Sequence, residues 1–146
     1  MNPELVGRVF PPTDPYLVGR EKVREFARAV FATDPSHTDR EAARALGYAD
    51  VVAPPTFAMV IQDLTLQQLL AEPDSGIALE RTIHAEQRFR YTRPIVAGDE
   101  LRASLSVVGV RAVGGNAMVT SEAEITDASG EHVVTATSVL LIGAES

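Results

Sequence analysis

The chain has 146 residues, of which 45% are hydrophobic and 23% charged, and this composition predicts one folded domain spanning residues 1–146. It contains no cysteine, which excludes disulfides and thiol nucleophiles, and its net charge of −7 without any tryptophan argues against nucleic-acid binding. We expect a soluble, cytoplasmic protein that does not act at a membrane, because the sequence shows neither a signal peptide nor an apolar run that could span a bilayer.

The first half of the chain has the periodicity of amphipathic helices. Residues 19–31 place four apolar side chains on one face at helical spacing: Val23, Phe26, Ala27 and Val30. Residues 38–45 are predicted to form a shorter helix, in which Thr38 and Glu41 have the spacing of a capping box and Gly47 is placed to end it. Both helices should therefore pack one face against the rest of the protein.

A third predicted helix is the most apolar, and we expect it to be the most buried. It begins near Pro55, because proline is well tolerated at the first helical position, and it runs to about Leu70. One stripe of this helix is apolar: Phe57, Val60, Ile61 and Leu64, with Leu69 nearby.

After a turn at residues 73–76 the hydrophobic period becomes two, which is typical of strands. The first strand is predicted to carry on one face Ile83, Ala85, Gln87, Phe89 and Tyr91, and on the other His84, Glu86, Arg88 and Arg90. Further alternating rows begin at Leu101 and Ala117, with a hairpin at residues 114–116 between them, and a last strand covers residues 133–142. The elements predict an α+β fold, in which a curved antiparallel sheet of at least four strands wraps around the third helix.

Neither a metal nor a cofactor is predicted. The three histidines, His37, His84 and His132, do not pair at metal-ligand spacing, and no phosphate-binding glycine loop or serine-nucleophile motif occurs.

Two segments of the helical half are candidates for chemistry. The loop between the first two helices holds His37 three residues after Asp34, so His37 is either a general acid or base or a solvated loop residue. Residues 51–57 lead into the third helix and are either a helix N-terminus that polarises a carbonyl group or simply a rigid start of that helix.

The first strand raises two further questions. Strict alternation places Gln87 beside Phe89 in an apolar row, where its amide needs partners, either an amide-rich arm of a ligand or a neighbouring loop. Several arginines either meet phosphates or an acidic partner protein, or form a solvated sheet face: Arg88, Arg90, Arg93, Arg102 and Arg111.

Four motifs resemble those of a known family: TDPSHTD at 33–39, VVAP at 51–54, IHAEQRFRY at 83–91 and RPIVAGD at 93–99. They resemble MaoC-like enzymes, hotdog-fold (R)-specific enoyl-thioester hydratases and 3-hydroxyacyl-thioester dehydratases. Together with the segments at 6–8 and 20–26, they resemble more specifically the N-terminal domain of MaoC-like, or FAS1-like, dehydratases, an actinobacterial branch that includes the mycobacterial subunit HadA. The resemblance covers nearly the whole chain and implies a hotdog fold, with the sheet wrapped around one long central helix.

The chain departs from the family's catalytic pattern. In the family, an aspartate and a histidine handle the water and the α-proton, and a glycine N–H at the start of the hotdog helix accepts the charge that develops on the thioester oxygen. His37 falls on the family histidine, whereas Ala32 falls on the aspartate. Pro54 and Pro55 fall on the His-Gly pair, and proline has no N–H to donate. The resemblance therefore leaves His37 and Asp34 as the candidate catalytic residues.

The function implied by this resemblance is that of an acyl-thioester-binding, non-catalytic subunit of a (3R)-hydroxyacyl-ACP/CoA dehydratase in fatty-acid metabolism. A catalytic hotdog chain would then supply the reactive groups. Two alternatives remain open: a homodimeric (R)-enoyl-thioester hydratase using His37 and Asp34, and a non-enzymatic acyl-binding homodimer. The ligand in each case is a thioester of coenzyme A or acyl carrier protein. The residues expected to bind it are Pro54, Pro55, Thr56, Phe57, Val60, His84, Gln87 and Phe89.

Overall fold

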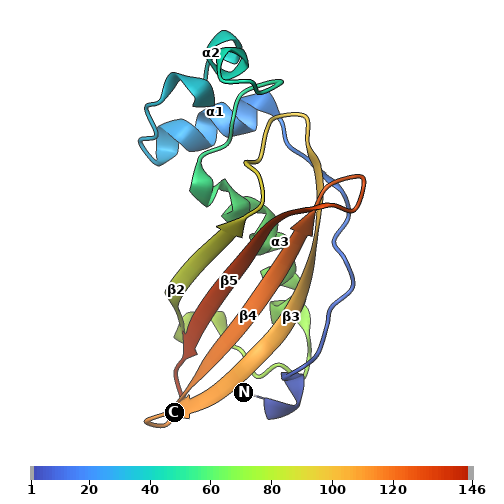
Figure 1. Cartoon of the computed structure of the whole chain (residues 1–146). Coiled ribbons are helices and arrows are strands. Elements are labelled where there is room, and N and C mark those ends of the chain that lie inside the picture. Colours follow the sequence, from blue (N-terminus) through green and yellow to red (C-terminus); the bar gives the residue numbers. More distant parts are fainter. Residues whose placement is uncertain (1, 145–146) are drawn as a thin grey trace.

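A computed structural model describes residues 2–144, with two helices gathered at one end and a curved sheet extending from them (Figure 1). The helices at this end are α1 (Arg20–Ala29) and α2 (Arg40–Ala45), and the longer α3 (Ala58–Ala71) lies against the sheet. Short 3₁₀ helices within the described residues span Pro3–Leu5, Pro35–His37, Pro55–Phe57 and Leu79–Arg81. No helix of residues 2–144 is long and apolar enough to cross a membrane.

The sheet of the described chain has five antiparallel strands in the order β1-β3-β4-β5-β2. Their bounds are Tyr16–Leu17 for β1, Thr82–Tyr91 for β2, Glu100–Val113 for β3, Asn116–Thr126 for β4 and His132–Ile142 for β5. Gly114 and Gly115 form the predicted hairpin between β3 and β4, and their φ values of 55° and 85° explain why glycine is needed at both positions. The curved sheet around a central helix confirms the predicted α+β hotdog fold.

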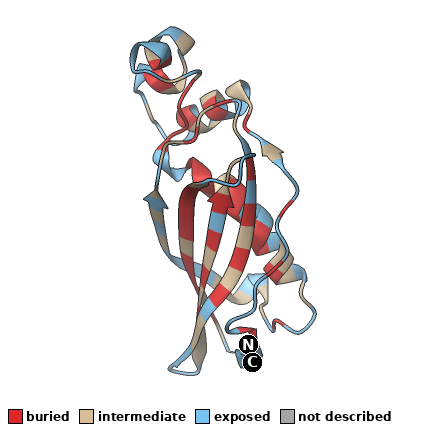
Figure 2. Cartoon of the chain, turned by 45° about the vertical axis from the view of Figure 1, so that its right-hand side comes forward, coloured by how far each residue is buried: buried red, intermediate tan, exposed pale blue. Residues whose placement is uncertain are grey.

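The core lies between α3 and the concave face of the sheet (Figure 2). Ile61 and Leu69 of α3 and the predicted inward row of β3 are fully buried. The buried positions of α3 are Ala58, Ile61, Gln62, Thr65, Leu66 and Leu69. Leu64, which we predicted in the buried stripe, lies outside this face and is 38% exposed. The central helix thus contacts the sheet through a face that includes two polar side chains.

The N-terminal cap of α2 differs from the prediction. The capping residue is Asp39, whose Oδ1 accepts a hydrogen bond from the Glu41 N–H at 2.9 Å. Thr38 ends the preceding 3₁₀ helix instead, so its predicted capping box with Glu41 was wrong. An aspartate one residue closer to the helix is an equally good cap and also complements the helix dipole. Gly47 does adopt the predicted left-handed conformation, with φ of 94°.

A β-bulge interrupts the predicted alternation of β2. His84 pairs with Leu140 and Glu86 with Val139, so one extra residue lies opposite a single step of β5. The extra residue shifts the pleat, which places His84 beside a groove on the α3 side and leaves Ile83 63% exposed. The prediction that Ile83 faces inward was therefore wrong, whereas His84 is exposed and Gln87 and Phe89 are half-buried beyond the bulge, as predicted.

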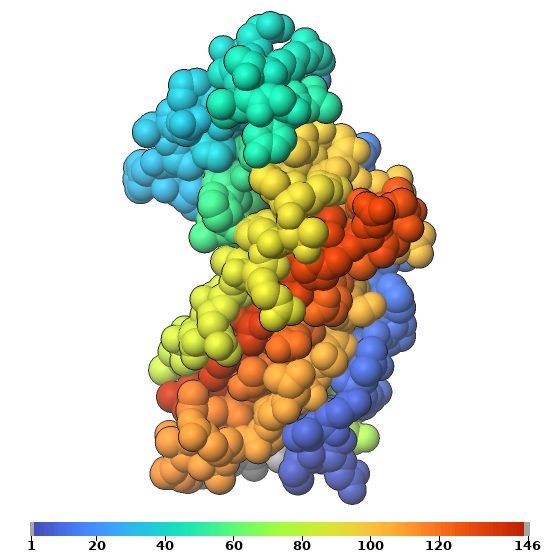
Figure 3. All heavy atoms as spheres, in the orientation of Figure 1, coloured from blue at the N-terminus to red at the C-terminus, as the bar shows by residue number. Residues whose placement is uncertain are grey.

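The two edges of the sheet differ in their protection. The N-terminal segment runs beside β3 (Figure 3), and Gly7, Phe10 and Thr13 donate backbone hydrogen bonds to β3 carbonyls at 2.8–2.9 Å. At the opposite edge, β2 pairs with β5 on one side and has no second neighbouring strand among residues 2–144. The β2 edge is therefore open to pairing with another sheet.

Candidate functional site

The helical end of the molecule holds His37 in a fixed position. His37 lies in the 3₁₀ helix between α1 and α2, and its Nδ1 is 2.6 Å from the Val52 carbonyl oxygen. Because a carbonyl can only accept, Nδ1 carries a proton and Nε2 is the basic nitrogen of the neutral ring. The Ser36 carbonyl in turn accepts a hydrogen bond from the Val52 N–H at 2.9 Å. Residues 36–37 are thus tied to the segment that leads into α3.

Asp34 serves as a cap rather than as a neighbour of the imidazole in the same pocket. Its Oδ1 accepts hydrogen bonds from the Ser36 N–H at 2.9 Å and the Ser36 hydroxyl at 2.7 Å. These bonds, and the nearby His37, lower the pKa of the Asp34 carboxyl. A more acidic, exposed carboxylate is a weaker proton acceptor, so its predicted catalytic role gains no support from this arrangement. Ala32 follows the end of α1, and its N–H donates to the Ala27 carbonyl at 2.8 Å.

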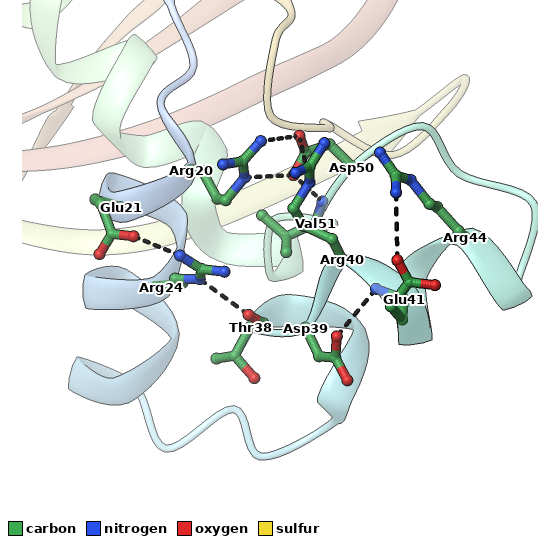
Figure 4. A network of polar contacts seen from close by, with 10 residues as sticks. All are labelled: Arg20, Glu21, Arg24, Thr38, Asp39, Arg40, Glu41, Arg44, Asp50 and Val51. Carbon is green, nitrogen blue, oxygen red and sulfur yellow. Dashed lines mark hydrogen bonds and ion pairs between the residues drawn. The ribbon is translucent and has the colours of Figure 1, made fainter.

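A network of charged side chains fastens α1, α2 and the segment before α3 together (Figure 4). Asp50 accepts two hydrogen bonds from Arg20, at 3.0 and 2.8 Å, and one from the Val51 N–H at 2.7 Å. Arg40 lies 3.5 Å from the same carboxylate. These contacts, Arg20 foremost, hold the pKa of Asp50 far below its usual range. Arg24 adds a hydrogen bond to the Thr38 carbonyl at 2.9 Å, next to His37.

A pocket of about 320 Å³ opens beside His37, and we call it the His37 pocket. It is lined by His37, Val52, Ala53, Pro55, Tyr91 and Pro94. Apart from the imidazole and the Tyr91 hydroxyl, these side chains are apolar. The pocket therefore suits an apolar ligand and holds no carboxylate that could work together with His37.

Tyr91 was not among the predicted site residues, although it lies at the centre of this arrangement. Its hydroxyl donates to the Pro55 carbonyl at the start of the central helix. Burial raises the pKa of Tyr91 to about 12, against the opposing effect of a hydrogen bond from the Ala58 backbone. The phenol is therefore neutral at physiological pH and covers the N-terminus of the helix. Its place at the end of an alternating strand, next to the RPIVAGD motif, was the available sequence signal.

The predicted substrate-binding residues around the start of α3 do not all reach the pocket. Pro55 lines it, as predicted. Pro54 is buried and Thr56 is exposed. Phe57 is fully buried and packs edge-to-face on Phe26, with ring centroids 5.3 Å apart. Pro54, Thr56 and Phe57 lie outside the lining of the His37 pocket. Val60 is partly buried and packs against the core. Ligand binding by Pro54, Thr56, Phe57 and Val60 stays a prediction.

The predicted binding residues of β2 form a separate row. Phe89 lies 6.2 Å from Tyr91 between ring centroids. Gln87 donates through Nε2 to Oε1 of Gln62 on α3 at 2.7 Å, so it ties the strand to the central helix. His84 lines a second groove farther along α3. Gln62 was missed by the sequence analysis, and a glutamine inside an apolar helix was the signal that could have identified it.

The described part of the chain holds no cluster of three or more histidine, aspartate or glutamate side chains that could bind a metal ion. The chemistry available at the His37 pocket is therefore that of one imidazole beside an apolar cavity and a proline-initiated helix. Such a site has room for an apolar group, but its lining lacks a carboxylate beside His37 and the N–H that Pro55 cannot provide.

Comparison with known proteins places this geometry in a family. The sequence model described as "FAS1-like, dehydratase domain region" matches residues 4–136. The chain belongs to this family of FAS1-like dehydratase domains. A UPF0336 protein of Clavibacter michiganensis subsp. michiganensis is 65% identical over 142 residues, which cover 97% of this chain and 95% of that protein. A UPF0336 protein of Streptomyces avermitilis is 48% identical over 141 residues, covering 97% and 94% of the two chains.

Solved structures extend the relationship to hotdog dehydratases. A chain of the C-terminally truncated HadBC (3R)-hydroxyacyl-ACP dehydratase complex from Mycobacterium tuberculosis has a TM-score of 0.87 and 34% identity, over 94% of this chain and 96% of that one. A MaoC-like dehydratase has a TM-score of 0.85 and 39% identity over 95% of this chain, which spans only 42% of that protein. The FAS1-like dehydratase domain described here is thus a member of the hotdog dehydratases, as the sequence motifs indicated.

Proposed function

We propose that this chain is the acyl-thioester-binding, non-catalytic subunit of a (3R)-hydroxyacyl-thioester dehydratase. The observation that carries the proposal is the His37 pocket, which is mostly apolar and has no carboxylate in its lining beside the imidazole. The two carboxylates near His37 in sequence both serve as helix caps: Asp34 accepts from Ser36, and Asp39 accepts from the Glu41 N–H. Pro55 stands where an oxyanion would need an N–H, and loss of one such donor typically lowers the rate about 10²–10³-fold.

A hotdog partner would supply the missing groups. The β2 edge is open, so a second curved sheet could pair with it and continue the sheet across the interface. The similarity to a chain of the HadBC complex supports a heteromeric assembly of this kind. The ligand would be an acyl thioester of coenzyme A or acyl carrier protein in fatty-acid metabolism, with its apolar part against the pocket lining.

The test is to co-express the chain with a hotdog subunit of the same organism that retains an intact D-x-N-P-x-H motif. The proposal predicts a stable heteromer that hydrates crotonyl-CoA or dodecenoyl-CoA faster than the partner alone. Equal rates for the partner alone and the mixture would refute it. A partner-free chain that hydrates these thioesters and loses activity in His37→Ala would favour a homodimeric hydratase. Binding without turnover and without a heteromer would favour an acyl-binding homodimer.

A further inference from the structure

Helix α3 and strand β2 lie side by side beyond the His37 pocket. The strand runs antiparallel to the helix, because Tyr91 contacts Pro55 at the helix start whereas Thr82 and His84 lie beside its C-terminal half. A second space of about 310 Å³ opens at that far end, and we call it the α3–β2 groove. Its apolar lining comes mainly from Met59, Leu66, Leu69, Leu70, Leu79 and Leu140.

Two glutamines join α3 to β2 between the residues that line the pocket and those that line the groove. Gln87 Nε2 donates to Gln62 Oε1 at 2.7 Å, and Gln62 Nε2 donates to the Ala136 carbonyl at 3.3 Å. Gln62 is completely buried. On the groove side, His84 Nε2 lies 3.0 Å from Gln87 Oε1, which can only accept, so this nitrogen carries a proton. We call the contact between the two amides the Gln62–Gln87 bridge.

The bridge is a polar contact between the two spaces, and the groove beyond it carries Asp63, Gln67, Thr82 and His84 beside its apolar lining. A hydrocarbon tail has no group that can replace either amide in a hydrogen bond. If a tail passed between α3 and β2 from the His37 pocket, Gln62 and Gln87 would have to separate, and a buried amide would lose its partner. Leaving a buried polar group unpaired is unfavourable, so entry of the tail is opposed for as long as the bridge is present. A tail that ends before the bridge meets no such opposition.

We propose that the Gln62–Gln87 bridge sets the length of the acyl chain that this protein accepts. Short chains stop at the bridge, and long chains occupy the α3–β2 groove only where the bridge opens. This inference rests on the proposed binding of acyl thioesters and deepens it by naming its specificity-determining residues. Gln62 and Gln87 lie outside the His37 pocket, so their role is selection of the chain and not chemistry.

The experiment replaces both amides together, in Gln62→Leu/Gln87→Leu, so that neither is left unpaired and the fold is preserved. Butyl and dodecyl thioethers of coenzyme A, which cannot react, are titrated into the full chain by calorimetry. The double variant should bind the dodecyl thioether at least about tenfold more tightly than the unaltered protein. Its affinity for the butyl thioether should stay within about twofold, because this chain does not reach the bridge.

Gln68→Leu is the matched control. Gln68 lies on the same helix and donates to the Pro11 carbonyl at 3.1 Å, outside the lining of the α3–β2 groove, so the same chemical change there should leave the dodecyl-to-butyl ratio unaltered. Should the double variant not fold, Gln87→Ala on the edge strand opens the bridge from one side. An unaltered ratio in the bridge variants, or no binding of either thioether by any variant, overturns the inference. Failure to activate a catalytic partner would instead refute the proposed function, because the binding ratio is measured without turnover.

Discussion

Replacement of Asp50 by asparagine should loosen the helical end that positions His37. The carboxylate accepts two hydrogen bonds from Arg20 and one from the Val51 N–H, and it lies near Arg40. Asparagine keeps the shape and one acceptor oxygen, but its NH₂ group faces a guanidinium that also donates. The charge and the 2.8 Å bond between Arg20 and Oδ2 are lost. We expect a destabilisation of about 2 kcal/mol, within the range for hydrogen bonds to charged groups and reduced by the partial exposure of Arg20.

The effect should depend on pH in a defined direction. The pKa of Asp50 is lowered in the folded protein, chiefly by Arg20, so the folded carboxyl releases its proton more readily than the unfolded one. The stabilisation is therefore fully present above the unfolded pKa of about 4 and is lost as the pH falls below it. The difference in unfolding free energy between the natural protein and Asp50→Asn should thus narrow between pH 7 and pH 3.

Urea unfolding followed by circular dichroism at both pH values measures this difference. At pH 7 a loss of about 2 kcal/mol corresponds to a melting temperature lower by roughly 4–8 °C for a chain of this size. Asp14→Asn is the control, since Asp14 is exposed and the described residues offer it no hydrogen bond or ion pair. Equal stability of Asp50→Asn and the natural protein at pH 7, or a gap that widens on acidification, would show that the network does not act as argued.

Three further changes test the site and the core. In the dehydratase pair, His37→Ala should lower kcat less than about threefold. Loss of a general acid or base would lower kcat about 10²–10⁴-fold, and a fall of that size would show that His37 takes part in catalysis. Ile61→Ala, at a fully buried position of α3, should cost about 2–5 kcal/mol in urea unfolding, and an unchanged midpoint would contradict the described core. Phe31 is 87% exposed and has a left-handed φ of 59°, which is strained for a side chain that carries a Cβ. Phe31→Gly should therefore raise the melting temperature, and the β-branched Phe31→Val should lower it. The reverse order would disprove backbone strain at this residue.

The elements of the fold could be predicted from sequence because their signals are local. The apolar rows of β3 and β4 alternate without interruption, and Gly114–Gly115 provides the backbone freedom that a two-residue hairpin needs. The helix after Pro55 has a mostly apolar sequence, which identified it as the centre of the core. The two-residue strand β1 was not predicted, because it depends on pairing with β3 and not on its own composition.

The wrong predictions of the α2 cap and of the inward face of β2 have one physical origin: in each, two arrangements of the chain differ by a shift of one residue. Thr38 and Asp39 are both good helix caps, and only the three-dimensional path of the chain selects Asp39. The bulge near His84 also shifts the pattern by one residue, and a shift of one exchanges the two faces of a strand.

The candidate site was predicted in part. The His37 segment and Pro55 do meet in one pocket, although they are far apart in sequence. Tyr91 and Gln62 were missed because their roles arise from contacts between β2 and α3, which no local pattern reveals. Phe57 packs on Phe26, as an aromatic side chain on an apolar helix stripe can, and its predicted contact with a ligand stays a prediction.

The central claim is that this FAS1-like dehydratase domain holds an acyl thioester but does not transform it. The most direct measurement follows the loss of enoyl-thioester absorbance when partner-free protein, in excess over dodecenoyl-CoA, is mixed with it for a single turnover. Binding should be saturable, and hydration should be no faster than in buffer. Hydration by the isolated chain at an ordinary enzymatic rate, abolished in His37→Ala, would contradict the account.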